Sequence, residues 1–181
     1  SKSFAPSAIS SGQTSVLTLN LTNPNTQNAI LTANLVDTLP AGLRLVNTNF
    51  GGSCTGTTSG TVGGNSITYA NGSVVPAYGG CTITANVTGD VPSVYTNTIP
   101  ANGLQTDQGN SPTPASANLT IATASLTKNF NPTIIPKNGV SVLTIVLGNA
   151  SASTITLTAP FIDYLPGSLR LLDTNFGGTC T

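Results

Sequence analysis

The chain has no histidine, methionine or tryptophan, and because all five of its acidic residues are aspartates it has no glutamate either. Only 6% of its residues are charged, and the formal net charge is zero. General acid–base catalysis and metal binding rely on these missing side chains. Nucleic acids and anionic membranes attract clustered Lys and Arg, whereas the five cations are scattered along this chain. We therefore expect no enzyme, no cofactor and no nucleic-acid partner.

Long apolar runs are missing as well. No stretch of the sequence approaches the roughly 18 uncharged apolar residues of a membrane-spanning helix. The first residues do not show the charged, apolar and small-residue pattern of a secretory signal. A fragment of a longer protein would lack both features, so we expect only that this fragment contains no membrane span.

What the chain does contain is a long internal repeat. The stretch "TNFGGSCT" at Thr48–Thr55 returns as "TNFGGTCT" at Thr174–Thr181. Placing each residue beside the one 126 positions later aligns Ser1–Thr55 with Thr127–Thr181 without a gap, and 26 of the 55 positions are identical. A repeat of this length corresponds to a whole domain and not to a solenoid unit of about 20–50 residues.

The repeat predicts the domain organisation. Residues 1–123 form a complete repeat, and residues 124–181 form the N-terminal part of a second, truncated one. The absence of Gly and Pro from Ser116–Asn131 predicts that the last strand of the first repeat runs almost directly into the first strand of the next. We expect the two copies to show the same early strands. Because half a sandwich cannot cover its inward side chains, four leucines of the second copy should be exposed, namely Leu143, Leu147, Leu157 and Leu171.

The three cysteines are explained by the same alignment. Cys180 matches Cys54, and the residue that would match Cys81 falls beyond position 181. We therefore predict a Cys54–Cys81 disulfide and a Cys180 that is unpaired because the second repeat is truncated. Such a disulfide indicates an oxidising, extracytoplasmic compartment. The alternative is a pair of buried thiols in a cytosolic domain.

Alternating apolar and polar residues predict strands. The clearest case is "CTITANVT" at Cys81–Thr88, in which every second residue faces inward. The same pattern turns leucines inward in Ser15–Thr22 and in its copy at Ser141–Gly148. No segment shows ten or more residues of helical period, so we expect no helix. Further strands are predicted over residues 29–37, 43–47, 66–69, 93–99 and 117–121.

Seven to nine short strands in about 120 residues are typical of an antiparallel sandwich with Greek-key connections. The predicted fold class is therefore all-β, with immunoglobulin-like antiparallel β-sandwiches in tandem. Tyr95 lies near the start of a late strand, directly after a corner. Its hydroxyl could bond back to the backbone in a tyrosine corner, or the ring could be an ordinary core aromatic.

Several motifs together resemble the bacterial extracellular tandem repeats grouped around the domain of unknown function eleven. They are "DTLPAGL" at Asp37–Leu43, "GGC" at Gly79–Cys81 and "YTNTIP" at Tyr95–Pro100. The resemblance covers the first repeat and the fragment of the second, where Asp163–Leu169 departs modestly. It implies immunoglobulin-like sandwiches strung along large secreted or surface proteins, and it supplies no catalytic residues.

The repeated D-x-L-P motif places Asp37 before Pro40 and Asp163 before Pro166. We expect the two aspartates to accept backbone N–H bonds and to fix a turn with the prolines. A calcium site is disfavoured, because Ca²⁺ takes about 6–8 oxygen ligands and no further acids lie nearby in the sequence. The sequence therefore predicts no metal site.

Lys2 and Lys128 each open a repeat on its first strand. Tandem surface sandwiches sometimes join a lysine to an asparagine through an isopeptide bond beside a buried acid. Here Lys2 would be the lysine, Asn97 the acceptor and Asp37 the acid. The sequence favours the alternative, in which Lys2 is solvated or makes a weak ion pair with an aspartate.

The leading functional hypothesis is a structural, non-catalytic module of a secreted or cell-surface bacterial protein, such as a stalk, fibre, adhesin or filament. Its partners would be neighbouring repeats of the same chain or like chains. The alternative is an adhesive module that binds a host or surface glycan or protein through the Gly-, Ser- and Thr-rich loop at residues 55–80. In that case Tyr69 and Tyr78 would supply the contact surface, because stacking aromatics are scarce elsewhere.

Overall fold

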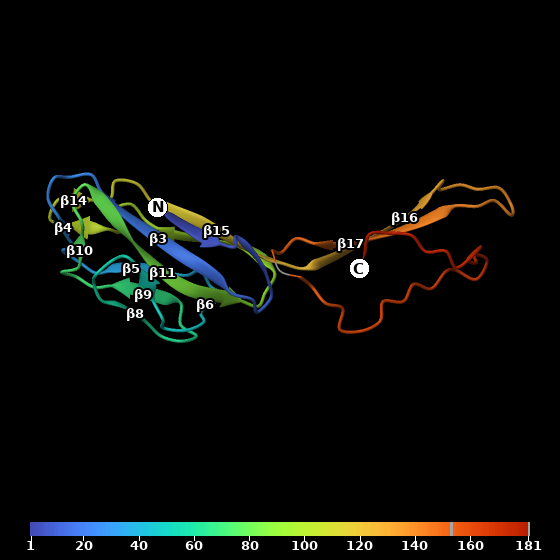
Figure 1. Cartoon of the computed structure of the whole chain (residues 1–181), viewed down its shortest axis with the longest axis horizontal. Coiled ribbons are helices and arrows are strands. Elements are labelled where there is room, and N and C mark those ends of the chain that lie inside the picture. Colours follow the sequence, from blue (N-terminus) through green and yellow to red (C-terminus); the bar gives the residue numbers. More distant parts are fainter. Residues whose placement is uncertain (153, 181) are drawn as a thin grey trace. The chain divides into compact units, whose positions relative to one another are not determined.

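The computed structural model describes residues 1–152 and 154–180, and within them the chain is built from strands and loops without a helix. The chain divides into two units, which are distinct in Figure 1. The first unit holds Ser1–Thr123 and a short segment that begins at Asn149. The second unit holds Ala124–Gly148 and the residues from Ile155 onward.

The first unit is an immunoglobulin-like β-sandwich, as predicted. Its largest sheet has the strand order β1-β3-β11-β6, and β7 also pairs with β11. All of these neighbours are antiparallel. The strands of this sheet are β1 (Lys2–Ala5), β3 (Ser15–Asn23), β11 (Gly79–Gly89), β6 (Leu43–Leu45) and β7 (Gly51–Gly52).

Two three-stranded sheets and two short strand pairs complete the unit. Strands β12 (Ser93–Ile99), β15 (Ala115–Ala122) and β2 (Ala8–Ser10) form the first sheet, in which β2 runs parallel to β15. Strands β5 (Leu35–Thr38), β9 (Ser66–Tyr69) and β8 (Thr58–Gly60) form the second. The short pairs are β4 (Ala29–Ile30) with β10 (Val74–Val75), and β13 (Gln105–Thr106) with β14 (Gly109–Asn110).

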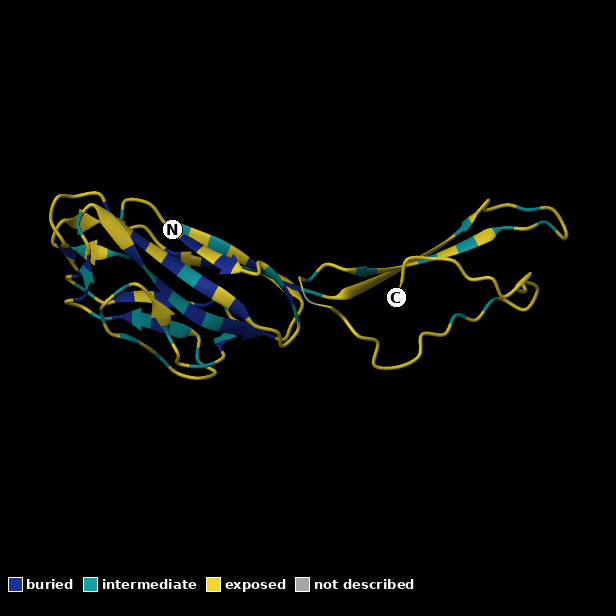
Figure 2. Cartoon of the chain, in the orientation of Figure 1, coloured by how far each residue is buried: buried dark blue, intermediate teal, exposed yellow. Residues whose placement is uncertain are grey.

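The predicted inward faces are confirmed. Leu17, Leu19 and Leu21 of β3 are buried, and so is every second residue of β11 from Cys81 to Val87. In Figure 2 the buried positions alternate along these strands of the first unit. The alternation follows from the period of two in a strand, which sends successive side chains to opposite faces of the sheet. The apolar residues of the facing sheets thereby share one core.

The tyrosine corner is also present. The Tyr95 hydroxyl donates a hydrogen bond to the carbonyl oxygen of Val91 at 2.8 Å. Its ring lies against Gly42, where an added Cβ would come within 2.7 Å of ring atoms. Gly42 also has a φ of 103°, which side chains rarely tolerate. Glycine is therefore required at position 42 both by its backbone conformation and by the tyrosine beside it.

The segment over residues 55–80, described above as a Gly-, Ser- and Thr-rich loop, is partly strand, and the strand predicted over residues 66–69 is confirmed. It contains β8, β9 and β10, and β9 pairs with both β5 and β8. Ile67 and Tyr69 on β9 are buried in the core. The pattern of apolar residues every second position in "SITY" outweighs the glycines and serines around it.

The second unit repeats only the start of the first. β16 (Ala124–Asn131) and β17 (Val142–Asn149) form a two-stranded sheet at the positions that match β1 and β3. β16 begins one residue after Thr123, so the expected short connection from β15 is confirmed. A local hydrogen bond also recurs: the side-chain hydroxyl donates to the proline carbonyl at 2.7 Å in both Ser15–Pro6 and Ser141–Pro132.

The prediction that all early strands recur is wrong beyond this pair. The described residues after Asn149 form no strand, although their counterparts include β5, β6 and β7. In the first unit these strands pair with β9 and β11. Residues matching β9 and β11 would be numbered beyond 181, so the second unit has no strands for this segment to pair with.

The leucines of the second copy are correspondingly uncovered. Leu147, Leu157 and Leu171 are exposed, as predicted, and Leu143 is half-buried. Their counterparts in the first unit are all buried, namely Leu21, Leu31, Leu45 and Leu17. Figure 2 shows the second unit mostly in the colour of exposed residues. Leucines at matching positions are thus buried in the first copy, which has the later strands, and mostly exposed in the second copy, which lacks them.

The core predicts a contrast between two identical substitutions. Val87 on β11 is completely buried, whereas Val94 on β12 is 60% exposed. We expect Val87→Ala to lower the free energy of unfolding of the first unit by about 2–3 kcal/mol, because it leaves a cavity in the core. Val94→Ala should change it by less than about 1 kcal/mol. Chemical denaturation of the two variants measures the difference, and equal losses would contradict the described core.

Candidate functional site

Three polar residues from three different sheets meet in the core of the first unit. Lys2 lies on β1, Asp37 on β5 and Asn97 on β12. All three are buried, with exposures of 8%, 1% and 0%. Each occupies an inward position of its strand, because the residues two places away are also buried or partly buried. The strand period that fills the core with leucines therefore also sends these three side chains into it.

The carboxylate of Asp37 joins the three side chains. The Lys2 ammonium nitrogen Nζ lies 2.8 Å from Asp37 Oδ1 and 2.9 Å from Oδ2. The Asn97 amide nitrogen Nδ2 donates to the same Oδ2 at 3.1 Å. The side-chain nitrogens of Lys2 and Asn97 thus both donate to one oxygen atom, Asp37 Oδ2. Asn97 Oδ1 is buried and has no hydrogen-bond partner among the described residues.

The burial of this group is energetically expensive. Removing two opposite charges from water costs several kcal/mol per ion, which their mutual attraction does not always recover. Burial lowers the pKa of the Lys2 ammonium below its usual value, and the hydrogen bond and charge of Asp37 only partly offset this effect. The Lys2 ammonium therefore gives up its proton more readily than the ammonium of an exposed lysine does.

The role expected for Asp37 is wrong, and the expectation for Lys2 is confirmed in part. Asp37 does not fix a turn through backbone N–H groups, because it lies within β5 and its carboxylate accepts from Lys2 and Asn97. Lys2 is not solvated, because its side chain has 0% exposure, whereas the expected alternative of a pair with an aspartate is present as its contact with Asp37. The turn itself exists beside Pro40, whose carbonyl accepts from the Leu43 N–H at 3.0 Å.

The second copy contains the corresponding pair without the asparagine. Lys128 Nζ lies 2.6 Å from Asp163 Oδ1, and the two side chains remain 36% and 21% exposed. Asp163 therefore also pairs with a lysine and not with turn N–H groups, while Pro166 accepts from Leu169 at 2.8 Å. The lysine and aspartate come together in both copies, although in the second copy the segment that contains Asp163 forms no strand.

The cysteines pair as the repeat predicts. Cys54 and Cys81 form a disulfide with a Cα–Cα distance of 4.8 Å and a sequence separation of 27. Cys180 is a free, exposed cysteine. Cys81 is buried within β11, so the bond ties the segment after β7 to the central strand of the largest sheet.

The two tyrosines proposed as a contact surface lie in different environments. Tyr69 is 1% exposed and belongs to the core, so its assignment to a contact surface is wrong. It is in phase with the buried Ile67 on β9, a signal that the sequence already contained. Tyr78 is 75% exposed and remains available for contacts. Only one of the two aromatics can therefore contact a ligand.

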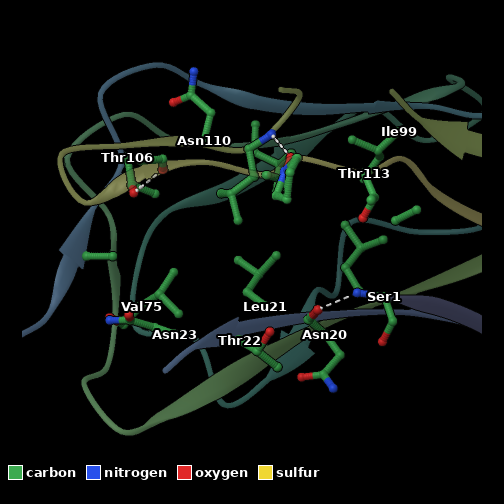
Figure 3. A pocket seen from close by; sticks show the side chains of 18 of the residues that line it. Ser1, Asn20, Leu21, Thr22, Asn23, Val75, Ile99, Thr106, Asn110 and Thr113 are labelled. Carbon is green, nitrogen blue, oxygen red and sulfur yellow. Dashed lines mark hydrogen bonds between the residues drawn. The ribbon is translucent and has the colours of Figure 1, made fainter. Parts of the chain in front are cut away.

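A cleft of about 630 Å³ lies where the end of β3 faces the segment around residues 99–116. Figure 3 shows Ser1, Asn20 and Asn23 on one side, with Thr106 and Asn110 across from them. Its lining side chains are neutral except for Lys2, which is buried. Sequence analysis missed this cleft, because no motif links the separate loops that enclose it.

The described residues offer few other candidates for a functional site. They contain no group of three or more His, Cys, Asp or Glu that could hold a metal ion. None of their elements is a helix of the length and apolarity needed to cross a membrane. The candidate functional site is therefore the triad of Lys2, Asp37 and Asn97.

Comparison with known proteins identifies the family. The model of a domain of unknown function, DUF7933, matches residues 1–121. The chain belongs to this family, whose domain coincides with the first sandwich. Neither the curated proteins nor the solved structures contain a match to the chain. The resemblance to the domain-of-unknown-function-eleven group stays a prediction.

The disulfide gives a direct prediction. Labelling of the denatured, non-reduced chain should detect one thiol, at Cys180, because Cys54 and Cys81 are bonded to each other. Cys180→Ser should abolish the signal. Replacing Cys54 and Cys81 by alanine should lower the free energy of unfolding by about 3–4 kcal/mol, because the unfolded chain regains the freedom of a closed loop. Three labelled thiols in the original chain would contradict the pairing.

Proposed function

We propose that this member of the DUF7933 family is a structural, non-catalytic module of an extracellular or cell-surface tandem-repeat protein, such as a stalk, fibre, filament or adhesin. The observation that carries the proposal is the direct succession of repeats. β15 ends at Ala122 and β16 begins at Ala124, and β16 then starts the same strand pairing that β1 starts in the first unit. A series of such modules would span a distance that grows with the number of repeats.

Two further observations support a location outside the cytoplasm. The Cys54–Cys81 bond suits an oxidising compartment, where structural disulfides persist. The chain also has 6% charged residues, so its outer faces depend on Thr, Ser and Asn for solubility. Neutral polar surfaces of this kind suit closely packed modules, because they carry little charge repulsion between neighbours.

The second candidate function is ligand binding, in which case the domain would be an adhesive module. The exposed ring of Tyr78 and the neutral cleft of about 630 Å³ favour it. Sugars are commonly bound by an aromatic face together with neutral hydrogen-bonding groups, and Asn20, Thr106 and Asn110 supply such groups in the cleft. A host or surface glycan or protein would then be the partner.

The structural role predicts that length grows regularly with repeat number. Chains that contain one, two and three copies of the 126-residue repeat should show equal increments in maximum dimension by small-angle X-ray scattering. The short connection after Thr123 leaves little freedom for the modules to fold back on one another. A maximum dimension that stays constant as repeats are added would overturn the spacer role.

The binding role predicts that one substitution, at Tyr78, reduces glycan binding. If the first unit binds a glycan, the chain should give a saturable signal on a glycan array, and Tyr78→Ala should weaken the apparent affinity at least tenfold. If the module is purely structural, the chain should give no saturable signal. Tyr164→Ala is the matched control, because Tyr164 is 82% exposed but belongs to the second unit. A signal that both variants weaken equally would not come from the Tyr78 surface.

A further inference from the structure

We propose that Lys2 and Asn97 are joined by an intramolecular isopeptide bond, which forms within the folded first unit with Asp37 as the proton carrier. The bond would connect the lysine Nζ to the asparagine Cγ and release one molecule of ammonia. It would link the first strand of the sandwich to β12, near its end.

The geometry supplies each participant in the required place. Lys2 Nζ and Asn97 Nδ2 both contact Asp37 Oδ2, at 2.9 Å and 3.1 Å. The attacking amine therefore lies beside the amide that it must reach. Contact with the shared carboxyl group also holds both side chains in place, which removes much of the entropic cost of bringing reactants together.

The first step requires an uncharged amine and a polarised amide. In the proposed step the Lys2 proton moves to Asp37 and leaves a neutral pair, and the burial that lowers the pKa of Lys2 assists this transfer. Rotation of the Asn97 amide by half a turn then brings Oδ1 to the position of Nδ2. There Oδ1 accepts a hydrogen bond from the Asp37 carboxyl group, which satisfies an atom that otherwise has no partner.

Covalent bond formation then balances without any other reactant. The lone pair of Lys2 Nζ attacks Asn97 Cγ, and the Asp37 carboxyl group stabilises the negative charge that develops on Oδ1. Asp37 next moves a proton from Nζ to Nδ2, so that the C–N bond to Nδ2 breaks and ammonia leaves. The amine and primary amide become a secondary amide and ammonia, and Asp37 keeps the proton that it took from Lys2, so that a neutral carboxyl group remains beside the new amide.

The surroundings favour the forward reaction. The three side chains are buried, so water that would compete with the Lys2 amine for Asn97 Cγ is excluded. Lys2 and Ile99, which lies two residues after Asn97, both line the cleft of Figure 3. Ammonia released beside them has a short route to solvent, and its escape makes the reaction effectively irreversible.

The second copy provides an internal comparison. Lys128 and Asp163 are paired at 2.6 Å, but the residue matching Asn97 would be numbered 223. The pair is also partly exposed. We therefore expect a single isopeptide bond in the 181-residue chain, at Lys2 and not at Lys128.

Mass spectrometry of the intact, reduced chain tests the proposal. The chain should be lighter than its calculated mass by one ammonia. Trypsin cuts after Lys and Arg, so an unmodified chain yields peptides 1–2, 3–44 and 45–128. With the bond, cleavage after Lys2 fails and peptide 1–44 remains attached to peptide 45–128 after reduction. Fragmentation should locate the branch at Lys2 and Asn97.

Variants separate the roles of the three residues. Lys2→Arg keeps the positive charge beside Asp37 but supplies no amine that can form the bond. Asp37→Asn keeps the size of the side chain but removes the proton carrier, and Asn97→Ala removes the acceptor. Each variant should have its full calculated mass, whereas Lys128→Arg should still lack one ammonia.

Two outcomes would overturn the proposal. One is a folded original chain with its full mass and a free peptide 1–2. The other is ammonia loss that maps elsewhere, for example to a succinimide at Asn71–Gly72 or Asn102–Gly103, and persists in Asn97→Ala. Because the original chain is measured directly, a variant that fails to fold does not affect the result. The spacer role is tested separately by the scattering series, so either proposal can fail without the other.

Discussion

The ion pair between Lys2 and Asp37 is the constraint on which the first sandwich depends. An apolar core gains nothing from two charges, and each would be costly without the other. In the first unit their contact joins β1 to β5, and Asn97 adds β12 to the same buried group. The leucines around them provide most of the favourable burial energy, whereas the polar triad restricts which arrangement of sheets can bury them.

The comparison between the two copies separates these contributions. Where β9 and β11 are present, the early strands bury their leucines and the lysine and aspartate become inaccessible to solvent. Where these strands are missing, the lysine and aspartate still meet, but the apolar side chains stay exposed. The charge pair is thus present in both copies, and it is buried only in the copy that contains the later strands.

Much of this architecture could be predicted from the sequence. Alternation identified the inward faces of β3 and β11, and the repeat offset identified the disulfide. The sequence pointed to the three residues of the triad but not to their burial, because charged side chains were expected to face solvent. The contrary signal was present: Lys2 is in phase with Phe4, and Asp37 is in phase with Leu35 and Leu39. The sequence could not predict that β1, β5 and β12, which are far apart in the chain, meet at one point in the core. It also could not predict the cleft, because separate loops enclose it.

The parallel pairing of β2 with β15 has a mechanical consequence. The strands share the register Ala8–Thr120, Ile9–Ile121 and Ser10–Ala122, and β15 leads directly into the next repeat. The Lys2–Asn97 bond would carry a force that pulls the two ends of the first unit apart past β2. In a chain without this bond, such a force slides β2 and β15 along each other. All of their cross-strand hydrogen bonds then bear the load at once, in shear, whereas an antiparallel hairpin pulled open from its free ends loses its bonds one at a time.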